Sequence, residues 1–283
     1  MTTLVFGAGF LGERLATALP GAVLARGVDI GDRAAVLAAL RAHAPVAVIN
    51  AAGKTGRPNV DWCEEHPIET TRSNVVGPLV LAEACAERGV YLLHLASGCI
   101  FYGPSPSAGG WREDDFANPT SFYSRSKYAA DLVLSGLPDV AIVRLRMPID
   151  TVPGPRNLIT KLAGYAQVVD VTNSVTIVSD LVGVVRALVD RRATGIFHAT
   201  NPRPVRHAQL LGLYRQFVDP GHRFTLIGED ELVSRGLTTR ARSNCILASS
   251  RLEALGVRMR SSETALPEVF REYAAGVKAG KSP

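Results

Sequence analysis

The sequence lacks the features that mark membrane and secreted proteins. No run of about 18 apolar residues occurs in the 283 residues, so the chain offers no candidate for a helix that crosses a bilayer. Its first residues lead into an apolar segment and a glycine turn, with no charged leader and no cleavable apolar segment. We therefore expect a soluble protein that stays in the cytoplasm.

Cysteines are few, and their spacing does not suggest a covalent or metal-bound framework. The four cysteines form no Cys-x-x-Cys pair and no metal-ligand spacing with histidine (Cys63, Cys85, Cys99 and Cys245). Neither a disulfide framework nor a metal site is indicated. A functional cysteine in this chain would act through the reactivity of its thiol.

Blocks of like charge are also missing. The net charge of +5 is spread along the chain, and no basic block alternates with aromatic residues, so we expect no nucleic-acid binding. Two interpretations of the charge remain, because it either steers an anionic substrate or reflects only the composition of the genome. With 47% hydrophobic and 20% charged residues, the composition is that of an ordinary globular protein.

Short apolar segments alternate with helical stretches in the first half of the chain. An apolar run at 2–8 ends in a glycine turn, and residues 10–19 repeat apolar positions at helical spacing. Further strands are expected at 22–26, 46–51, 91–97 and 140–147, and helices at 32–43, 69–88 and 121–135. This alternation predicts an α/β fold with a doubly wound parallel sheet of the Rossmann type, covered by helices on both faces.

The second half of the chain predicts a smaller lobe. A stretch rich in proline and glycine begins at Pro148, and helical patterns follow at 206–218 and 262–275. Residues 179–200 return to a helix and a strand. We expect a nucleotide-binding domain of residues 1–148 and about 176–200, and a C-terminal substrate lobe of about 149–175 and 201–283.

A glycine-rich turn joins the first strand to the first helix. The segment Gly7-Ala-Gly-Phe-Leu-Gly12 places three glycines where a backbone can approach a pyrophosphate at a helix N-terminus. The strand before it and the helix after it favour dinucleotide binding over a merely structural turn. The expected cofactor contacts near these strand ends are Gly7, Gly9, Phe10, Leu11, Gly12, Ala51 and Ala52.

The residues after the second strand bear on the choice of cofactor. Arg26 stands where an acidic residue would otherwise accept the ribose hydroxyls, and a guanidinium suits a 2′-phosphate. NADPH is therefore favoured, with NADH as the alternative. Asp29 and Ile30 are candidates for the adenine edge, and an exposed turn is the other interpretation of these two residues.

A tyrosine and a lysine lie four residues apart at the start of a predicted helix. This spacing puts Tyr123 and Lys127 on one helical face, where an ammonium is expected to lower the pKa of the phenol. Tyr123 then suits the role of proton donor to a carbonyl oxygen whose carbon receives a hydride, and Lys127 also holds the nicotinamide ribose. Ser97 ends the preceding strand and is the expected third member.

The three motifs together resemble the extended short-chain dehydrogenases/reductases. Within that family the chain is similar to the dTDP-4-dehydrorhamnose reductase branch, through 48–53, 99–103, 113–114 and 123–127. The segments 53–64, 146–149, 156–161 and 242–244 further resemble the nucleotide-rhamnose synthase/epimerase-reductase proteins. The resemblance runs from residue 3 nearly to the end of the chain.

The resemblance implies a bifunctional enzyme with Cys99 and Lys161 in the epimerase role. Such an enzyme converts NDP-4-keto-6-deoxy-glucose to NDP-L-rhamnose by 3,5-epimerisation and NADPH-dependent 4-reduction. Inversion needs deprotonation on one face of an enolate and reprotonation on the other, which requires two groups. Without the resemblance, Cys99 would be interpreted as core packing and Lys161 as a surface lysine.

The same segments contain candidates for contact with the sugar nucleotide. Polar groups expected near the carboxyl edge of the sheet are Thr55, Arg57, Asn59, Arg156, Asn157 and Arg242. Each arginine has the alternative of a solvated surface charge, and Arg242 suits bidentate pairing with a diphosphate. Trp62, Glu64 and His66 are expected to shape this wall, and His94 to be a satisfied core residue.

Three further expectations rest on the resemblance. The helices at 69–88 and 121–135 imply a homodimer, and a separate 4,6-dehydratase is expected to supply the substrate. The loop at 103–113 departs from the pattern of the plant members of the nucleotide-rhamnose synthase/epimerase-reductase proteins, which leaves open whether the carrier is UDP or dTDP. Two other functions remain: a 4-ketoreductase without epimerase activity, and a non-catalytic regulatory protein that binds a dinucleotide.

Overall fold

The structure is a computed structural model that describes residues 2–57, 59–240 and 242–280. Met1, Pro58, Ala241 and residues 281–283 lie outside the described residues. Pro58 belongs to the 53–64 segment, and residues 281–283 belong to the end of the expected lobe. No helix among the described residues is both long enough and apolar enough to cross a membrane.

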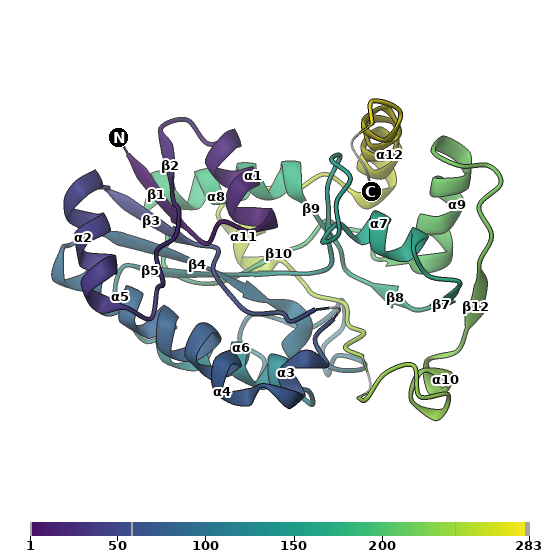
Figure 1. Ribbon diagram of the computed structural model, residues 1–283, viewed down its shortest axis with the longest axis horizontal. Helices are drawn as coiled ribbons and strands as arrows, with labels where there is room; N and C mark the ends of the chain where they lie inside the picture. The colour runs from purple at the N-terminus through teal and green to yellow at the C-terminus, as the bar shows by residue number, and fades with distance from the viewer. Residues whose placement is uncertain (1, 58, 241, 281–283) are drawn as a thin grey trace.

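A six-stranded parallel sheet forms the centre of the first part of the chain (Figure 1). The strands follow the order β10-β5-β4-β3-β1-β2, with every neighbouring pair parallel. Their bounds are β1 Thr3–Phe6, β2 Ala22–Ala25, β3 Ala47–Asn50, β4 Tyr91–Ser97, β5 Val140–Leu145 and β10 Gly195–Ala199. The predicted doubly wound fold and its strands are confirmed, with ends that differ by one or two residues.

Helices cover both faces of the sheet, as predicted (Figure 1). One face packs against α1 Phe10–Ala18, α8 Val178–Arg191 and α11 Ser250–Ala254. The other packs against α2 Arg33–His43, α5 Gly77–Glu87 and α6 Phe122–Leu134. Alternate residues of one strand serve the two cores, since Leu4 and Phe6 lie in one and Val5 in the other. Each such buried side chain stabilises the fold by about 1.5–3 kcal/mol.

The helix expected at 69–88 is interrupted by a wider turn. It is built from α4 Pro67–Thr71, a π-helical turn η1 Arg72–Val76 and α5. Pro78 in the first turn of α5 has no N–H group, so the carbonyl of Asn74 loses its usual donor four residues on. The backbone compensates with one turn of wider hydrogen bonding.

A smaller lobe lies beyond the carboxyl edge of the sheet, at the right of Figure 1. Three of its helices, at 158–163, 207–217 and 262–278, pack around a core of their own and include the predicted helical stretches at 206–218 and 262–275. The helices are α7 Leu158–Ala163, α9 His207–Phe217, α10 Glu229–Ser234 and α12 Ser262–Lys278. Three two-stranded pairs accompany them: β6 Pro148–Ile149 with β9 Thr176–Ile177, β7 Gln167–Val169 with β12 Thr225–Ile227, and β8 Thr172–Asn173 with β11 Val205–Arg206.

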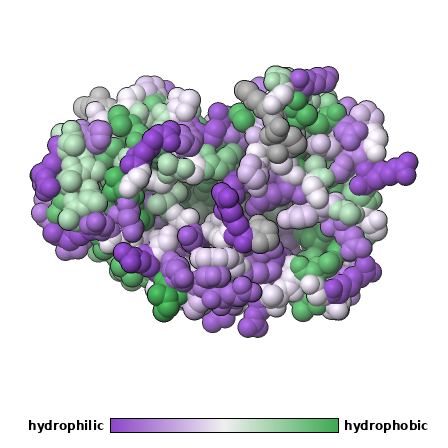
Figure 2. Space-filling view, in the orientation of Figure 1, coloured by the Kyte–Doolittle hydropathy of each residue, from purple (hydrophilic) through white to green (hydrophobic). Residues whose placement is uncertain are grey.

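The chain after α10 returns from the lobe to the sheet. Trp111 N–H donates to the carbonyl of Ile246 at 2.8 Å, and Ala248 N–H donates to the carbonyl of Trp111 at 2.8 Å. Leu247 and Cys245 of this returning segment pack with Phe101 and Trp111. Figure 2 shows a recess between the sheet domain and the lobe, with hydrophilic side chains around it.

Candidate functional site

In the glycine turn after β1, the backbone is crowded at Gly7 and Gly12 and open at Gly9. Gly7 has φ +97°, and a side chain there would overlap the backbone of Ala52. A side chain at Gly12 would overlap the carbonyl of Gly7, whereas one at Gly9 would meet nothing within 4 Å. Gly9 is exposed and caps the N-terminus of α1, so its surroundings fit a pyrophosphate against free N–H groups.

The other expected cofactor residues lie around this turn. Phe10 and Leu11 form the first turn of α1, and Ala51 and Ala52 follow β3 beside Gly7. Ala51 N–H donates to the carbonyl of Phe6 at 2.8 Å, which joins the two strand ends. These contacts build the rim of the turn, and cofactor binding by the four residues stays a prediction.

Arg26 lies next to the glycine turn, but it is paired. Its guanidinium donates to both carboxylate oxygens of Glu13 in α1, at 2.6 and 2.8 Å, and this pair raises the pKa of Arg26. Asp29 accepts from the N–H of Gly31 at 2.9 Å in an exposed turn, whereas Ile30 is buried against Gly77. Their predicted cofactor roles stay predictions.

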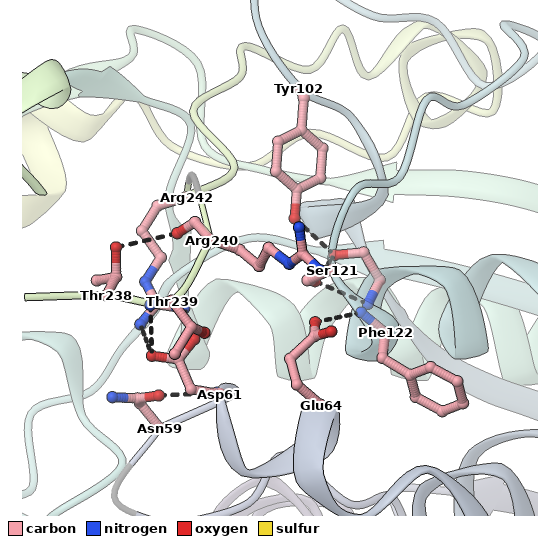
Figure 3. Close-up of polar contacts among 11 residues, drawn as sticks. Asn59, Asp61, Glu64, Tyr102, Ser121, Phe122, Thr238, Thr239, Arg240 and Arg242 are labelled. Atoms are coloured by element: carbon pink, nitrogen blue, oxygen red, sulfur yellow. Dashed lines mark hydrogen bonds and ion pairs between the residues drawn. The ribbon is translucent and has the colours of Figure 1, made fainter. Parts of the chain in front are cut away.

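The proton-donor residues come from two adjacent elements. Ser97 ends β4, and Tyr123 lies in the first turn of α6, which Ser121 caps by accepting from Ser124 N–H at 3.2 Å. Glu64 adds a carboxylate at this helix N-terminus, where it accepts from the N–H of Phe122 at 2.6 Å (Figure 3). The helix start that positions Tyr123 is therefore fixed from two sides.

Lys127 is buried one turn after Tyr123. Its ammonium donates to the carbonyl of Leu95 at 3.1 Å and lies 3.2 Å from His94 Nε2. Burial lowers the pKa of Lys127 to about 8. His94 is itself buried, with Nδ1 3.0 Å from Asn50 Nδ2, which confirms the prediction of a satisfied core histidine.

The pKa of Tyr123 moves in the opposite direction from the prediction. Burial raises the pKa of the phenol above its ordinary value, and a contact with Ser97 offsets only part of that rise. Lys127 does not contribute to this shift because its Nζ is held by Leu95 and His94. The prediction of a lowered phenol pKa is therefore wrong for this structure, where Tyr123 is a protonated donor at neutral pH.

Cys99 lies two residues beyond Ser97 in a short 3₁₀ turn, η2 Gly98–Ile100. The Oγ atom of Ser97 accepts from Cys99 N–H at 3.1 Å, which fixes the turn. Arg146 Nη1 donates to Cys99 Sγ at 2.7 Å. The cysteine is half-buried rather than packed in the core, and its thiol is held by a charged partner.

Lys161 approaches the same place from the lobe. It lies on α7, where Asn157 caps the helix by accepting from Ile159 N–H at 3.1 Å. Burial and the charge of Arg156 lower the pKa of Lys161, and Cys99 is near enough to oppose that shift. Cys99 also raises the pKa of Tyr123, so Cys99 lies within electrostatic reach of both groups.

Arg146 is the site residue that sequence reasoning missed. It follows β5 and is 3% exposed, with Nη2 donating to Asn173 Oδ1 at 2.6 Å and to the carbonyl of Ser243. The segment 146–149 entered the sequence analysis only as part of a resemblance. The available signal was an arginine directly after an apolar strand, at the edge where ligands bind in such sheets.

The expected substrate residues divide between the wall of the recess and the fold. Arg156 contacts Thr55 Oγ1 and donates to the carbonyl of Gly56 at 3.1 Å, so it joins the lobe to the loop after β3. Asn157 is buried and donates to the carbonyls of Asp150 and Val152 at 2.7 and 2.9 Å. Substrate contact by Thr55, Arg156 and Asn157 stays a prediction.

Arg242 of the returning segment is paired with Asp61 (Figure 3). Its guanidinium donates to both oxygens of Asp61, at 2.8 and 2.9 Å, and this pair lowers the pKa of Asp61 against the cost of its burial. Asn59 accepts from the N–H of Asp61 at 2.8 Å, and Arg57 is exposed nearby. Trp62 and His66 stack on each other at 3.9 Å in the adjoining wall. Substrate contact by Arg57, Asn59 and Arg242 stays a prediction.

No group of three or more histidine, cysteine, aspartate or glutamate side chains suited to a metal ion occurs in the part of the chain that the structure describes. The ionisable groups at the recess are instead a tyrosine, a thiol, two lysines and arginines. Such a set donates protons and binds anions, which suits a carbonyl substrate that carries phosphates.

Comparison with known proteins gives one family and several named relatives. The family model for the RmlD substrate binding domain matches residues 1–274. A bifunctional dTDP-4-dehydrorhamnose 3,5-epimerase/dTDP-4-dehydrorhamnose reductase of Arabidopsis thaliana is 45% identical over 195 residues, which are 67% of this chain and 65% of that protein. A trifunctional UDP-glucose 4,6-dehydratase/UDP-4-keto-6-deoxy-D-glucose 3,5-epimerase/UDP-4-keto-L-rhamnose-reductase of the same plant is 39% identical over 246 residues, which are 84% of this chain and 37% of that protein.

Solved structures agree with these relatives. A UDP-rhamnose synthase from Acanthamoeba polyphaga mimivirus superposes with a TM-score of 0.88 at 28% identity, covering 96% of this chain and 99% of that one. The chain spans 65% and 37% of the length of the two plant relatives.

Proposed function

The chain belongs to the RmlD substrate binding domain family, and on that premise we propose that it is a bifunctional 3,5-epimerase/4-ketoreductase that converts NDP-4-keto-6-deoxy-glucose to NDP-L-rhamnose with NADPH. The relatives that are named as epimerase and reductase together support this proposal. The observation that carries it is that Cys99 lies within electrostatic reach of both Tyr123 and Lys161, although the three residues come from three separate elements.

The reductase half uses the residues at the ends of β4 and α6. NADPH supplies the hydride for C4 when it is bound, with NADH as the alternative cofactor. Ser97 and Tyr123 hydrogen-bond the ketone oxygen, and Tyr123 gives it a proton as negative charge develops there. The raised pKa of Tyr123 keeps that proton on the phenol at neutral pH. Lys127 holds the nicotinamide ribose.

The epimerase half uses the same ketone as an electron sink. A hydrogen on a carbon next to the ketone is acidic because the resulting carbanion is an enolate, which Ser97 and Tyr123 stabilise. Cys99 and Lys161 then exchange protons at that carbon from opposite faces. Burial and the charge of Arg156 lower the pKa of Lys161, which makes its ammonium a stronger acid than an exposed lysine.

The remaining roles follow the division between sheet domain and lobe. We propose residues 1–148 and about 176–200 as the NAD(P)-binding domain, and about 149–175 and 201–283 as the sugar-nucleotide lobe. The cofactor contacts are those expected around Gly7–Gly12, Arg26, Asp29, Ile30, Ala51 and Ala52, and the substrate contacts are Thr55, Arg57, Asn59, Arg156, Asn157 and Arg242. A 4,6-dehydratase supplies the substrate, and the enzyme works in the cytoplasm.

A homodimer is proposed through the helices of the face opposite α1 and α8. Apolar side chains on these helices remain exposed, namely Ile68 at 77% and Val76 at 44% on α4 and η1, and Leu132 at 55% and Val133 at 51% on α6. Packing two copies through this face would remove them from water. A monomeric mass by light scattering would reject the dimer.

The test is conversion of UDP- and dTDP-4-keto-6-deoxy-glucose with NADPH in deuterated water, with the product identified by NMR. We expect L-rhamnose with solvent deuterium at C3 and C5. An unlabelled 6-deoxy-hexose with NADPH consumed would leave a 4-ketoreductase only. No oxidation of NADPH with either sugar would leave a dinucleotide-binding regulatory protein.

Cofactor preference has its own test. If Arg26 leaves Glu13 to bind a 2′-phosphate, then the wild type has a lower Michaelis constant for NADPH than for NADH, and Arg26→Ala narrows that gap. Arg186→Ala is the matched control, because Arg186 is another exposed arginine that pairs with a carboxylate on a helix. A clear NADH preference in the wild type would contradict the role of Arg26.

A further inference from the structure

Arg146 is buried and has no carboxylate partner among the residues that the structure describes. Its three acceptors are Cys99 Sγ at 2.7 Å, Asn173 Oδ1 at 2.6 Å and the carbonyl of Ser243. Its Nε is buried and has no partner among the described residues. Because a guanidinium does not lose its proton in proteins, this positive charge persists in the interior.

A buried cation needs an anion, and only one of these acceptors is able to become one. The amide of Asn173 and the carbonyl of Ser243 accept hydrogen bonds but carry no net charge. The thiol of Cys99 is the one acceptor of the three that has an anionic form, and it lies 2.7 Å from the Arg146 guanidinium. A thiolate at Cys99 would balance the charge that the rest of the pocket leaves uncompensated.

The other ionisable groups near Cys99 do not compete for this role. Lys161 approaches it from α7 and is a lysine, which has no anionic form. Tyr123 approaches it from α6 and Cys245 from the returning segment, and burial raises the pKa of both groups. Tyr123 and Cys245 therefore stay neutral, which leaves the Cys99 thiol as the candidate for a negative charge beside Arg146.

We propose that Arg146 is a positioning residue that holds Cys99 as a thiolate and aims it into the recess, which makes Cys99 the base and Lys161 the acid of each epimerisation. This inference rests on the proposed epimerase function. In the step, Cys99 Sγ takes a proton from the carbon next to the ketone, and the C–H electron pair passes to the ketone oxygen to give an enolate. The pair then returns to the carbon, where it forms the new C–H bond with a proton from Lys161 Nζ on the other face, and the ketone is restored. The thiol and the amine then exchange protons with water.

The first test does not depend on the sugar. The rate of alkylation of Cys99 by iodoacetamide is measured against pH in the wild type, Arg146→Met and Arg146→Lys, with the labelled peptide identified by mass spectrometry. We expect Arg146→Met to move the half-maximal pH upward by at least ~1 unit and to slow alkylation at pH 7 about tenfold, because the thiolate loses its cation. Arg146→Lys should recover part of the effect.

The control is Arg186→Met, which removes an exposed arginine far from this pocket and should leave the profile unchanged. Superimposable profiles for wild type and Arg146→Met would overturn the proposal. If Arg146→Met does not fold, the absorbance near 240 nm, where thiolates absorb, is measured against pH in the wild type and in Cys99→Ser. The difference between the two curves gives the titration of Cys99 in the intact protein. A midpoint above that of an ordinary thiol, ~8.5, would then overturn it.

The second test separates this inference from the proposed function. Deuterium uptake at C3 and C5 of the sugar is followed in the same variants. Uptake in the wild type that falls at least tenfold in Arg146→Met, while the NADPH-dependent reduction of an already epimerised 4-keto sugar persists, supports the proposal. If the alkylation profile of Cys99 depends on Arg146 but the sugar takes up no deuterium, the proposed epimerase activity is refuted and the Arg146–Cys99 pairing stands. If the sugar takes up deuterium but the alkylation profile does not depend on Arg146, the epimerase activity stands and the pairing is refuted.

Discussion

Two buried arginines at the end of β5 differ in what balances their charge. Arg144 and Arg146 lie two residues apart and so face the same side of the sheet. Arg144 Nε donates to Asp131 Oδ2 of α6 at 2.9 Å, in a pair whose side chains are 2% and 0% exposed. Arg146 instead meets a thiol, an amide and a carbonyl.

The difference separates a structural charge from a functional one. Arg144 lies between the sheet and α6, where a carboxylate of the same domain neutralises it. Its Nη1 donates to the carbonyl of Glu113 and lies 3.3 Å from His198 Nε2. Arg146 lies one step nearer the carboxyl edge of the sheet, where it meets Cys99. The same residue type on the same strand face therefore serves the fold in one place and the site in the other.

The largest expected effect comes from changing Cys99, the partner of Arg146. Cys99→Ser should abolish the solvent label at C3 and C5, with a loss of about 10²-fold or more, because a hydroxyl is a far weaker base than a thiolate. Reduction of an already epimerised 4-keto sugar should continue, as Ser97 and Tyr123 are untouched. Cys85→Ser is the control, since Cys85 is buried in the sheet core. Retained label in Cys99→Ser would return the thiol to a packing role.

The next largest effect is the loss of unfolding free energy when Arg144 is replaced. Arg144→Met leaves Asp131 buried and unpaired, and removing one member of a buried ion pair costs about 3–5 kcal/mol of unfolding free energy. Urea denaturation measures this loss. The double variant Arg144→Met/Asp131→Leu should recover part of it, because both members of the pair are then removed while the ammonium of Lys127 loses a neighbouring carboxylate. A loss of less than about 1 kcal/mol of unfolding free energy in Arg144→Met would show that Arg144 has no structural role of the kind described.

Lys127 lies one turn before Asp131 and makes the Arg144 side sensitive to pH. Burial lowers the pKa of Lys127 from 10.5 to about 8, so the unfolded chain binds one more proton than the folded one between these values. The free energy of unfolding should therefore rise with pH across this window, by about 3 kcal/mol relative to Lys127→Met. Below pH 8 the two proteins should show parallel profiles. A parallel course above pH 8 as well would contradict the buried ammonium.

The smallest expected effect concerns the ion pair between Arg242 and Asp61. Arg242 and Asp61 are 23% and 20% exposed, and we propose that a diphosphate competes with Asp61 for the guanidinium. Asp61→Asn should then strengthen UDP binding a few-fold and Arg242→Gln should weaken it, effects of about 1 kcal/mol that calorimetry resolves. Equal shifts in one direction for both variants would mean that the pair only joins the lobe to the sheet domain.

Much of the fold could be predicted from the sequence because its signals are local. Strand length and helical spacing gave the alternation of β and α elements, and Gly7 and Gly12 marked a turn in which side chains would overlap the backbone. The break in the helix at 69–88 was missed, because a proline in the first turn of a helix is ordinary and only its carbonyl partner shows the wider turn.

The sequence by itself determined the doubly wound sheet, the glycine turn and the Tyr123–Lys127 spacing, since each depends on residues a few positions apart. Only the tertiary structure decided how charges meet: Arg146 with Cys99, Arg26 with Glu13, Arg242 with Asp61, and Lys127 with Leu95 and His94. Burial and pairing shift the pKa values of Tyr123, Lys127 and Asp61, and both arise from segments far apart in the chain. The pKa of Tyr123 was mispredicted for this reason, because spacing along a helix does not show where an ammonium is held.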